Sequence, residues 1–214
     1  MISHTRRAIF VHVPKTGGQS IVRAFLREDG LRWEDRHRLE VRDNQDPALG
    51  PAVLDHMLAR EYVEHRHVTP EQYRTYFKFS VVRNPWDRLV SAYKFSQERR
   101  PHLRGIPFAA FVEGRLPPDL RLARHLVPQW AFVCDTDGAM LVDAVLRFET
   151  LERDFAMVSR RMFGRPVALE HTNRSADRRD YREFYTDAAA ALVAERYRHD
   201  IDRFGYRFDD ATKE

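Results

Sequence analysis

A chain of 214 residues is long enough for one ordinary domain with a sizeable core, and we predict a single domain over residues 1–214. Hydrophobic residues make up 43% of the chain and charged residues 32%, a balance that excludes global disorder. The net charge of +4 favours an anionic partner without naming one, and the single cysteine excludes an intramolecular disulfide and a cysteine-rich metal site. No apolar run approaches the roughly 18 residues of a membrane span, so we expect a cytoplasmic protein without stable membrane insertion.

The N-terminal region predicts a strand followed by a helix. The strand covers Ala8 to Val13, where apolar and β-branched residues dominate. The helix runs from about Gly17 to Glu28, and its apolar residues recur four positions apart, which favours packing on a sheet. Residues 29–50 are polar and contain turn-forming residues, so they predict a long loop or lid.

Two helix starts and a buried strand follow. In the sequence EHRHVTPEQY, Thr69 is the expected N-cap, Pro70 the first helical residue and Gln72 the capping-box partner. The sequence YFKFSVVR at residues 76–83 is the clearest strand of the chain. A further helix is expected directly after it, with Asn84 as its cap and proline at its first position.

The second half of the chain continues the alternation of strands and helices. Residues 101–128 are rich in proline and have short helical patterns. Two more strands are predicted at QWAFVC (129–134) and MLVDAVLRF (140–148), then a helix over 151–162 and a last helix from about Thr186. Strands that alternate with helices indicate a mostly parallel sheet covered on both faces. We therefore predict a three-layer α/β/α fold.

The segment VPKTGGQS joins the first strand to the first helix and is the first candidate site. Gly17 and Gly18 remove the Cβ atoms that would block an anion, and the helix N-terminus adds a partial positive charge. Lys15 supplies a full charge, while Thr16 and Ser20 offer hydroxyl donors. The segment therefore predicts a P-loop-like cradle for phosphate or sulfate, although the lysine precedes the glycines. A tight turn that requires glycine only for its backbone angles is the structural alternative.

The second candidate site lies in VVRNPWDRLVSAYKF. Arg83 ends a buried strand, and the carboxyl ends of parallel strands form the crevice in which α/β proteins bind ligands. Its planar guanidinium suits a phosphate group. Ser91 lies two turns along the next helix, on the face of its cap Asn84. Alternatively, Arg83 forms a buried ion pair with Asp87, and Ser91 has no special role.

Together these two segments resemble the cofactor-binding motifs of sulfotransferases that use 3′-phosphoadenosine 5′-phosphosulfate (PAPS). The likeness is to the carbohydrate branch, which includes the heparan sulfate 2-O- and chondroitin 4-O-sulfotransferases and many bacterial members. The stretches LRFETLERDF, HTNRS and YREFYTD are also similar to the bacterial members, so the resemblance covers nearly the whole chain. It implies transfer of a sulfuryl group from PAPS to a hydroxyl of a saccharide or glycan-containing acceptor, with no metal required.

The resemblance also implies roles for individual residues. Lys15 would contact the phosphosulfate and stabilise the departing adenosine 3′,5′-bisphosphate (PAP). The phosphate of that group would be cradled by Thr16, Gly17, Gly18, Gln19 and Ser20. The 3′-phosphate would be held by Arg83 and Ser91, with Arg174 and Ser175 of HTNRS closing over it. Gln19 departs from the threonine or serine that is more frequent in the family, which puts one hydroxyl contact in doubt.

The segment EHRHV supplies the expected general base. If residues 62–67 are extended, His65 and His67 project to the same side. The segment resembles the His-x-His-Val stretch of the heparan sulfate 2-O-enzyme, in which the second histidine is the catalytic base. The resemblance therefore implies that His67 removes the acceptor proton and that His65 orients it. A surface histidine and half of a metal site remain the alternatives.

Two other functions compete with sulfuryl transfer. A P-loop-type nucleotide-dependent kinase or phosphotransferase is disfavoured by the order of the loop residues and by the lack of a convincing strand that ends in a metal-binding aspartate. A basic nucleic-acid-binding module is disfavoured because the arginines are spread along the chain, often beside acidic residues. We expect acceptor contacts from residues 29–60 and 99–128 and no nucleic-acid partner. The sequence leaves the acceptor and the oligomeric state open.

Overall fold

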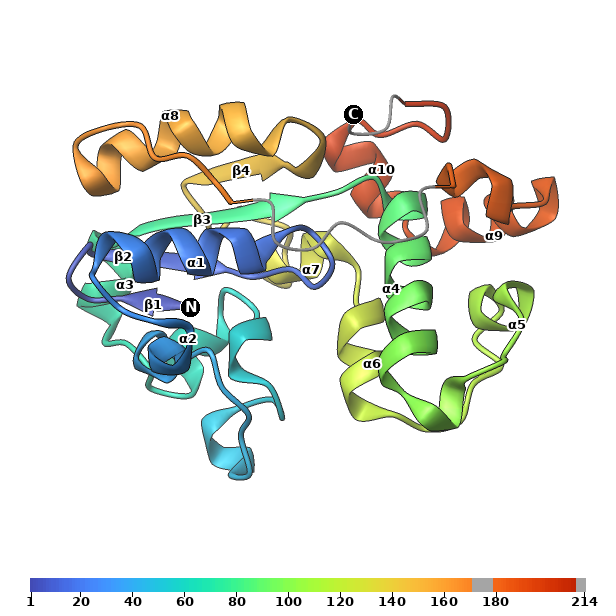
Figure 1. Cartoon of the computed structure of the whole chain (residues 1–214), viewed down its shortest axis with the longest axis horizontal. Helices are drawn as coiled ribbons and strands as arrows, with labels where there is room; N and C mark the ends of the chain where they lie inside the picture. The colour runs from blue at the N-terminus through green and yellow to red at the C-terminus, as the bar shows by residue number, and fades with distance from the viewer. Residues whose placement is uncertain (171–178, 211–214) are drawn as a thin grey trace.

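The computed structural model describes residues 1–170 and 179–210 and contains a four-stranded sheet in the order β1-β2-β3-β4 (Figure 1). The strands are β1 (Ile2–Ser3), β2 (Ala8–Val11), β3 (Phe77–Val82) and β4 (Ala144–Arg147). β2, β3 and β4 are parallel, whereas β1 pairs antiparallel with β2. The predicted mixed α/β fold with a mostly parallel sheet is therefore confirmed, and β1 is an edge strand that the sequence pattern did not reveal.

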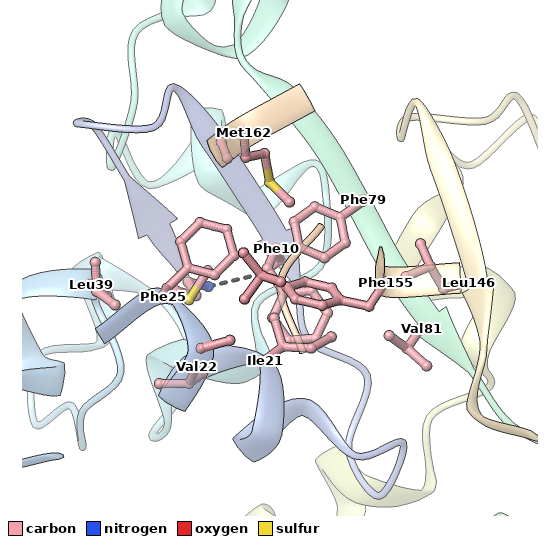
Figure 2. Packing of buried hydrophobic residues seen from close by; sticks show 14 of the residues in the cluster. Phe10, Ile21, Val22, Phe25, Leu39, Phe79, Val81, Leu146, Phe155 and Met162 are labelled. Atoms are coloured by element: carbon pink, nitrogen blue, oxygen red, sulfur yellow. Dashed lines mark hydrogen bonds between the residues drawn. The ribbon is translucent and has the colours of Figure 1, made fainter. Parts of the chain in front are cut away.

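The side chains of β2 belong to two separate hydrophobic cores, because successive residues of a strand point to opposite faces of the sheet. Ala8 and Phe10 join a core with α1 (Gly18–Glu28) and α8 (Leu151–Phe163). Figure 2 shows the centre of this core, where the rings of Phe10, Phe25, Phe79 and Phe155 lie together. Ile9 and Val11 belong to the core on the other face, which α2 (Glu61–Glu64), α7 (Gln129–Val133) and α10 (Arg198–Phe204) help to form. Helices thus cover both faces of the sheet.

A third apolar cluster lies beyond the carboxyl end of the sheet. It is built on α4 (Pro85–Arg99), which stands steeply to the strands at one side of the molecule (Figure 1). Around it pack α5 (Phe108–Val112), α6 (Leu120–Leu126) and α9 (Asp187–Arg196). This helical unit contacts the loop that follows β2, where the Lys15 ammonium lies over the Phe95 ring of α4, and the carboxyl ends of parallel strands are where α/β proteins bind ligands.

Several short elements complete the described chain. The remaining α-helices are α2 (Glu61–Glu64), α3 (Pro70–Thr75), α7 (Gln129–Val133) and α10 (Arg198–Phe204). The 3-10 segments are η1 (Trp33–Leu39), η2 (Pro47–Leu49), η3 (Leu54–His56), η4 (Pro101–Leu103), η5 (Phe148–Thr150) and η6 (Tyr181–Phe184). None of the helices within residues 1–170 and 179–210 is long and apolar enough to cross a bilayer.

The predicted N-terminal caps of α3 and α4 are confirmed. The Thr69 hydroxyl accepts from the backbone N–H of Gln72, and the Gln72 side chain accepts from the N–H of Thr69. Asn84 caps α4 through its side-chain oxygen, which accepts from the N–H of Trp86 at 3.1 Å. Local side-chain chemistry decides both starts, which is why the sequence alone predicts them.

One predicted strand is wrong, and the condition on which His65 and His67 would project to the same side is not met. QWAFVC forms helix α7, because the buried carboxylate of Asp200 accepts the N–H groups of Gln129 and Trp130 at 2.9 and 2.8 Å and so caps the helix. The segment 62–67 is not extended either: α2 occupies its first part, and Arg66 then takes a left-handed backbone with φ 59°. The polar segment 29–50, predicted as a loop, contains the 3-10 segments η1 and η2.

Candidate active site

The segment from Pro14 to Ser20 makes a tight turn between β2 and α1. Two of its residues, Lys15 and Gly17, have left-handed backbones with φ 68° and 83°. Gly18 needs to be glycine for another reason: a Cβ atom there would lie 2.1 Å from Nε2 of His12. One glycine therefore provides the backbone angle and the next allows the close approach of a histidine ring.

The N-terminus of α1 is open to an anion. No side chain within the described residues caps this helix, and its first turn, from Gly18 to Ile21, carries no acidic residue. The helix has 11 residues, so its first turn presents N–H groups and a partial positive charge. The Thr16 hydroxyl donates to the carbonyl of Val13 at 2.8 Å, so it closes the turn itself. Gln19 is exposed and Ser20 half-buried at the same helix start.

The fit of Gly18 against His12 gives a first testable prediction. Gly18→Ala should lower the free energy of unfolding by about 1–3 kcal/mol, because the new methyl group displaces the His12 ring. For a chain of this size, each kcal/mol corresponds to roughly 2–4 °C in Tm, which a thermal melt can measure. The cost should fall when His12→Ala is present as well. An equal cost in both backgrounds would show that the ring is not the obstacle.

Lys15 lies between the turn and α4. Its ammonium is 4.1 Å from the centroid of the Phe95 ring, a cation–π contact. Burial, together with a smaller effect of the positive charge of Arg83, lowers the pKa of Lys15 to about 8. An anion bound at this position would reverse both effects, since it would restore a counter-charge to the buried ammonium.

Arg83 connects the two candidate segments. Its Nη1 donates to the carbonyl of Lys15 at 3.1 Å, and its Nε and Nη2 form a bidentate pair with Asp87 at 2.7 Å each. The ion pair that was one interpretation of Arg83 is therefore present, together with the link to the loop. The guanidinium also lies over the ring of Phe148, 4.1 Å from its centroid. Ser91 lies two turns further along α4 and is half-buried.

The backbone of Arg83 is held by a residue of α7. The side chain of Gln129 accepts from the N–H of Arg83 at 2.9 Å and donates to its carbonyl at 2.8 Å. Gln129 is fully buried, and its own N–H is held by Asp200 of α10. The position of Arg83 thus depends on two elements that follow it by many residues.

His65 and His67 lie on the segment that follows α2, and the contacts described for them are with residues 40–50. His65 Nδ1 donates to the carbonyl of Ala48 at 3.0 Å, and His67 Nε2 donates to the carbonyl of Leu49 at 2.8 Å. His67 Nδ1 is 3.9 Å from the carboxylate of Glu40. Both histidines therefore hold the polar segment 40–50 against α2. Arg174 and Ser175 lie outside the described residues.

A different group of histidines lies beside the turn, and sequence reasoning missed it. The rings of His12 and His56 are 4.6 Å apart, and those of His56 and His125 are 5.3 Å apart. Asp55 lies next to the first pair, with its Oδ2 3.4 Å from His12 Nδ1. The ring of His125 reaches Phe95, which is the ring that Lys15 covers. These residues come from three distant parts of the chain, so no local spacing signals them.

Burial controls the ionisation of this histidine group. It lowers the pKa of His56 to about 4, against the opposing effect of Asp55. Burial also lowers the pKa of His125 well below its usual range, and the charges of His56 and Lys15 add to this. Although burial opposes it, the charges of His56 and His12 hold the pKa of Asp55 well below its usual range. Near neutral pH the group therefore contains a carboxylate beside a neutral His56 ring.

With this geometry in view, comparison with known families is decisive, because the model of the Sulfotransferase family matches residues 1–207. The chain belongs to the sulfotransferase family. This is an enzyme family that uses PAPS as cosubstrate and a hydroxyl-bearing acceptor. No curated protein and no solved structure gave a significant match to this sulfotransferase.

The residues present in this sulfotransferase fit a sulfonated nucleotide. Within the described residues no side chain caps the start of α1, so its backbone N–H groups are available as donors, and the half-buried Lys15 places its ammonium over the Phe95 ring. Arg83 brings a second cation to the same turn through the Lys15 carbonyl. A dianionic group placed here would relieve the mutual repulsion of the two cations, which is the electrostatic requirement of such a site.

Proposed function

We propose that this sulfotransferase moves a sulfuryl group from PAPS to a hydroxyl of a saccharide or glycan-containing acceptor. The observation that carries the proposal is the hydrogen bond between Arg83 and the Lys15 carbonyl. It joins the two segments that resemble the phosphosulfate and 3′-phosphate motifs, in a chain whose family uses PAPS. The alternatives of a kinase and a nucleic-acid-binding module have no comparable support.

The chain's own residues divide the work as follows. When bound, PAPS supplies an activated sulfuryl group with PAP as the leaving group. Lys15 and the first N–H groups of α1 stabilise the negative charge that builds on the leaving side. Arg83 and Ser91 hold the 3′-phosphate and fix the nucleotide in line with the acceptor. In this assignment the Asp87 carboxylate keeps the Arg83 fork in a fixed orientation.

The proton acceptor is a choice between two histidines. The resemblance favours His67, whereas the geometry favours His56. The His56 ring contacts His12, which packs against Gly18 at the start of α1. Its Nδ1 donates to the carbonyl of His12 at 3.1 Å, so Nε2 carries the lone pair that can accept a proton. We therefore propose His56 as general base and keep His67 as the alternative.

A saccharide acceptor is supported by the surroundings of His12. A cavity of about 560 Å³ opens there, and its wall includes Trp33, Arg36 and Arg42. An aromatic ring beside arginines suits a sugar ring that carries acidic groups. These residues lie in the segment 29–60, from which acceptor contacts were expected.

Ligand-induced stabilisation tests the nucleotide part of the proposal. PAP at 100 times its Kd should stabilise the protein by about 2.7 kcal/mol, which raises its Tm, whereas ATP with Mg²⁺ should have a much smaller effect. The PAP effect should weaken as the pH rises through about 8, because the Lys15 ammonium then loses its charge. A larger shift with ATP and Mg²⁺ than with PAP would favour the kinase.

A further inference from the structure

Three side chains beside the turn converge in a way that the transfer reaction does not require. His12 follows β2, while Asp55 and His56 lie in η3. Each residue offers one ligand atom, and the three atoms lie within 4.8 Å of one another. Asp55 Oδ2 is 3.4 Å from His12 Nδ1 and 3.7 Å from His56 Nε2. In a tetrahedral zinc site, ligand atoms at about 2.0–2.1 Å from the metal are separated by roughly 3.4 Å.

The hydrogen bond of His56 shows that its second ring nitrogen is an acceptor close to the carboxylate of Asp55. A carbonyl oxygen can only accept, so the bond from His56 to the His12 carbonyl places the hydrogen on Nδ1. The remaining ring nitrogen, Nε2, therefore carries a lone pair, and it lies 3.7 Å from the carboxylate of Asp55, beyond hydrogen-bond distance. His12 Nδ1 is buried and finds no hydrogen-bond partner among the described residues.

Facing acceptors repel one another unless a proton or a cation lies between them. The side chains of His12 and Asp55 are only 6% and 14% exposed, so water screens the repulsion poorly. The hydrogen bond from His56 Nδ1 to a backbone carbonyl is the outer-shell contact that orients metal-binding histidines. The cavity of about 560 Å³ touches both His12 and Asp55, so it provides a path for an ion.

We infer that His12, Asp55 and His56 form a binding site for a divalent transition-metal ion. Two imidazoles and one carboxylate suit zinc best, and three protein ligands leave a coordination position open towards the cavity. The bound ion would occupy the Nε2 lone pair of His56. If the proposed function is correct, zinc therefore inhibits sulfuryl transfer by occupying the general base. This second statement rests on the proposed function, whereas metal binding does not.

Spectroscopic titration with Co²⁺ tests the site directly. The full chain, first treated with a chelator, should bind one equivalent of Co²⁺ with the visible absorption of a four- or five-coordinate ion, and Zn²⁺ should displace it. Zn²⁺ should also raise the Tm of the unmodified protein, a measurement that needs no variant. His56→Gln and Asp55→Asn should each weaken Co²⁺ binding by about 100-fold or more, since even outer-shell losses cost 10- to 100-fold.

The control is His67→Gln, because His67 is a half-buried histidine outside the cluster, on the segment that follows α2, and its replacement should leave Co²⁺ affinity unchanged. Two results overturn the inference: no Co²⁺ binding by the unmodified chain, which would mean a cluster closed by protons only, or equal binding by the His56→Gln variant. One-equivalent binding lost in both cluster variants supports it, even if the chain transfers no sulfuryl group. Zinc inhibition that EDTA reverses would add the link to the transfer reaction.

Discussion

Replacing Lys15 with alanine is expected to lower kcat for sulfuryl transfer by about 100- to 1,000-fold. Loss of one donor that stabilises developing negative charge costs roughly 3–4 kcal/mol in comparable sites. The effect should be large here because Lys15 is half-buried, so that water screens its charge less than at the surface, and because the neighbouring Arg83 is already engaged with Asp87. Single-turnover measurements with saturating PAPS separate this loss from weaker binding.

The matched control for that variant is Lys94→Ala. Lys94 is another lysine, in α4, and its ammonium lies over the Phe184 ring, 4.8 Å from the centroid. It has no place in the proposed machinery, so its variant should keep kcat within a few-fold of the unmodified enzyme. Near-normal turnover in the Lys15→Ala protein would show that Lys15 does not stabilise the transition state, and the proposed role of the turn would be wrong.

Replacing His56 with glutamine is expected to reduce kcat by about 100- to 10,000-fold, the usual contribution of a general base. Glutamine can still donate to the His12 carbonyl, so the loss should reflect the missing proton acceptor more than a disturbed fold. The pH profile is the informative measurement. The acidic limb that reports protonation of the base should disappear in the variant, provided that the assays contain a chelator.

His67→Gln provides the comparison within the same assay. Its ring holds the carbonyl of Leu49 and lies near Glu40, so we expect a modest loss of stability and a kcat within a few-fold. If instead His67→Gln abolishes turnover and His56→Gln does not, the base is the residue that the family resemblance indicates, and the geometric argument is wrong.

The parts of the fold that the sequence predicts are those decided by neighbouring residues. The cap at Thr69 and the turn at Gly17 follow from local hydrogen bonding and backbone angles, and the buried strand at 77–82 follows from its apolar run. Helix α7 could not be predicted in this way, because the carboxylate that caps it belongs to Asp200, 70 residues further along. Apolar runs of this length fit a strand and a helix equally well, and a tertiary contact makes the choice.

The candidate site likewise contains residues that the sequence predicts and residues that only tertiary packing brings together. Lys15 and Arg83 could be found because each follows a buried strand, and parallel strands bring their carboxyl ends together. The histidine group could not be found, because His12, His56 and His125 meet only through the packing of η3 and α6 against the end of β2. Conversely, the short spacing of His65 and His67 drew attention to a pair that binds carbonyl groups of a neighbouring segment.

If Arg83 holds the 3′-phosphate as proposed, the buried contact between Asp200 and α7 makes nucleotide recognition depend on the C-terminal region. The Asp200 carboxylate in α10 accepts the backbone N–H of Gln129, and the side-chain amide of Gln129 donates to the carbonyl of Arg83, the residue assigned to the 3′-phosphate. A protein that ends before residue 198 would still contain Lys15, Arg83 and Ser91, the side chains proposed to bind the nucleotide. It would nevertheless bind PAP weakly, because without Asp200 the side chain of Gln129 would no longer hold the backbone of Arg83 in place.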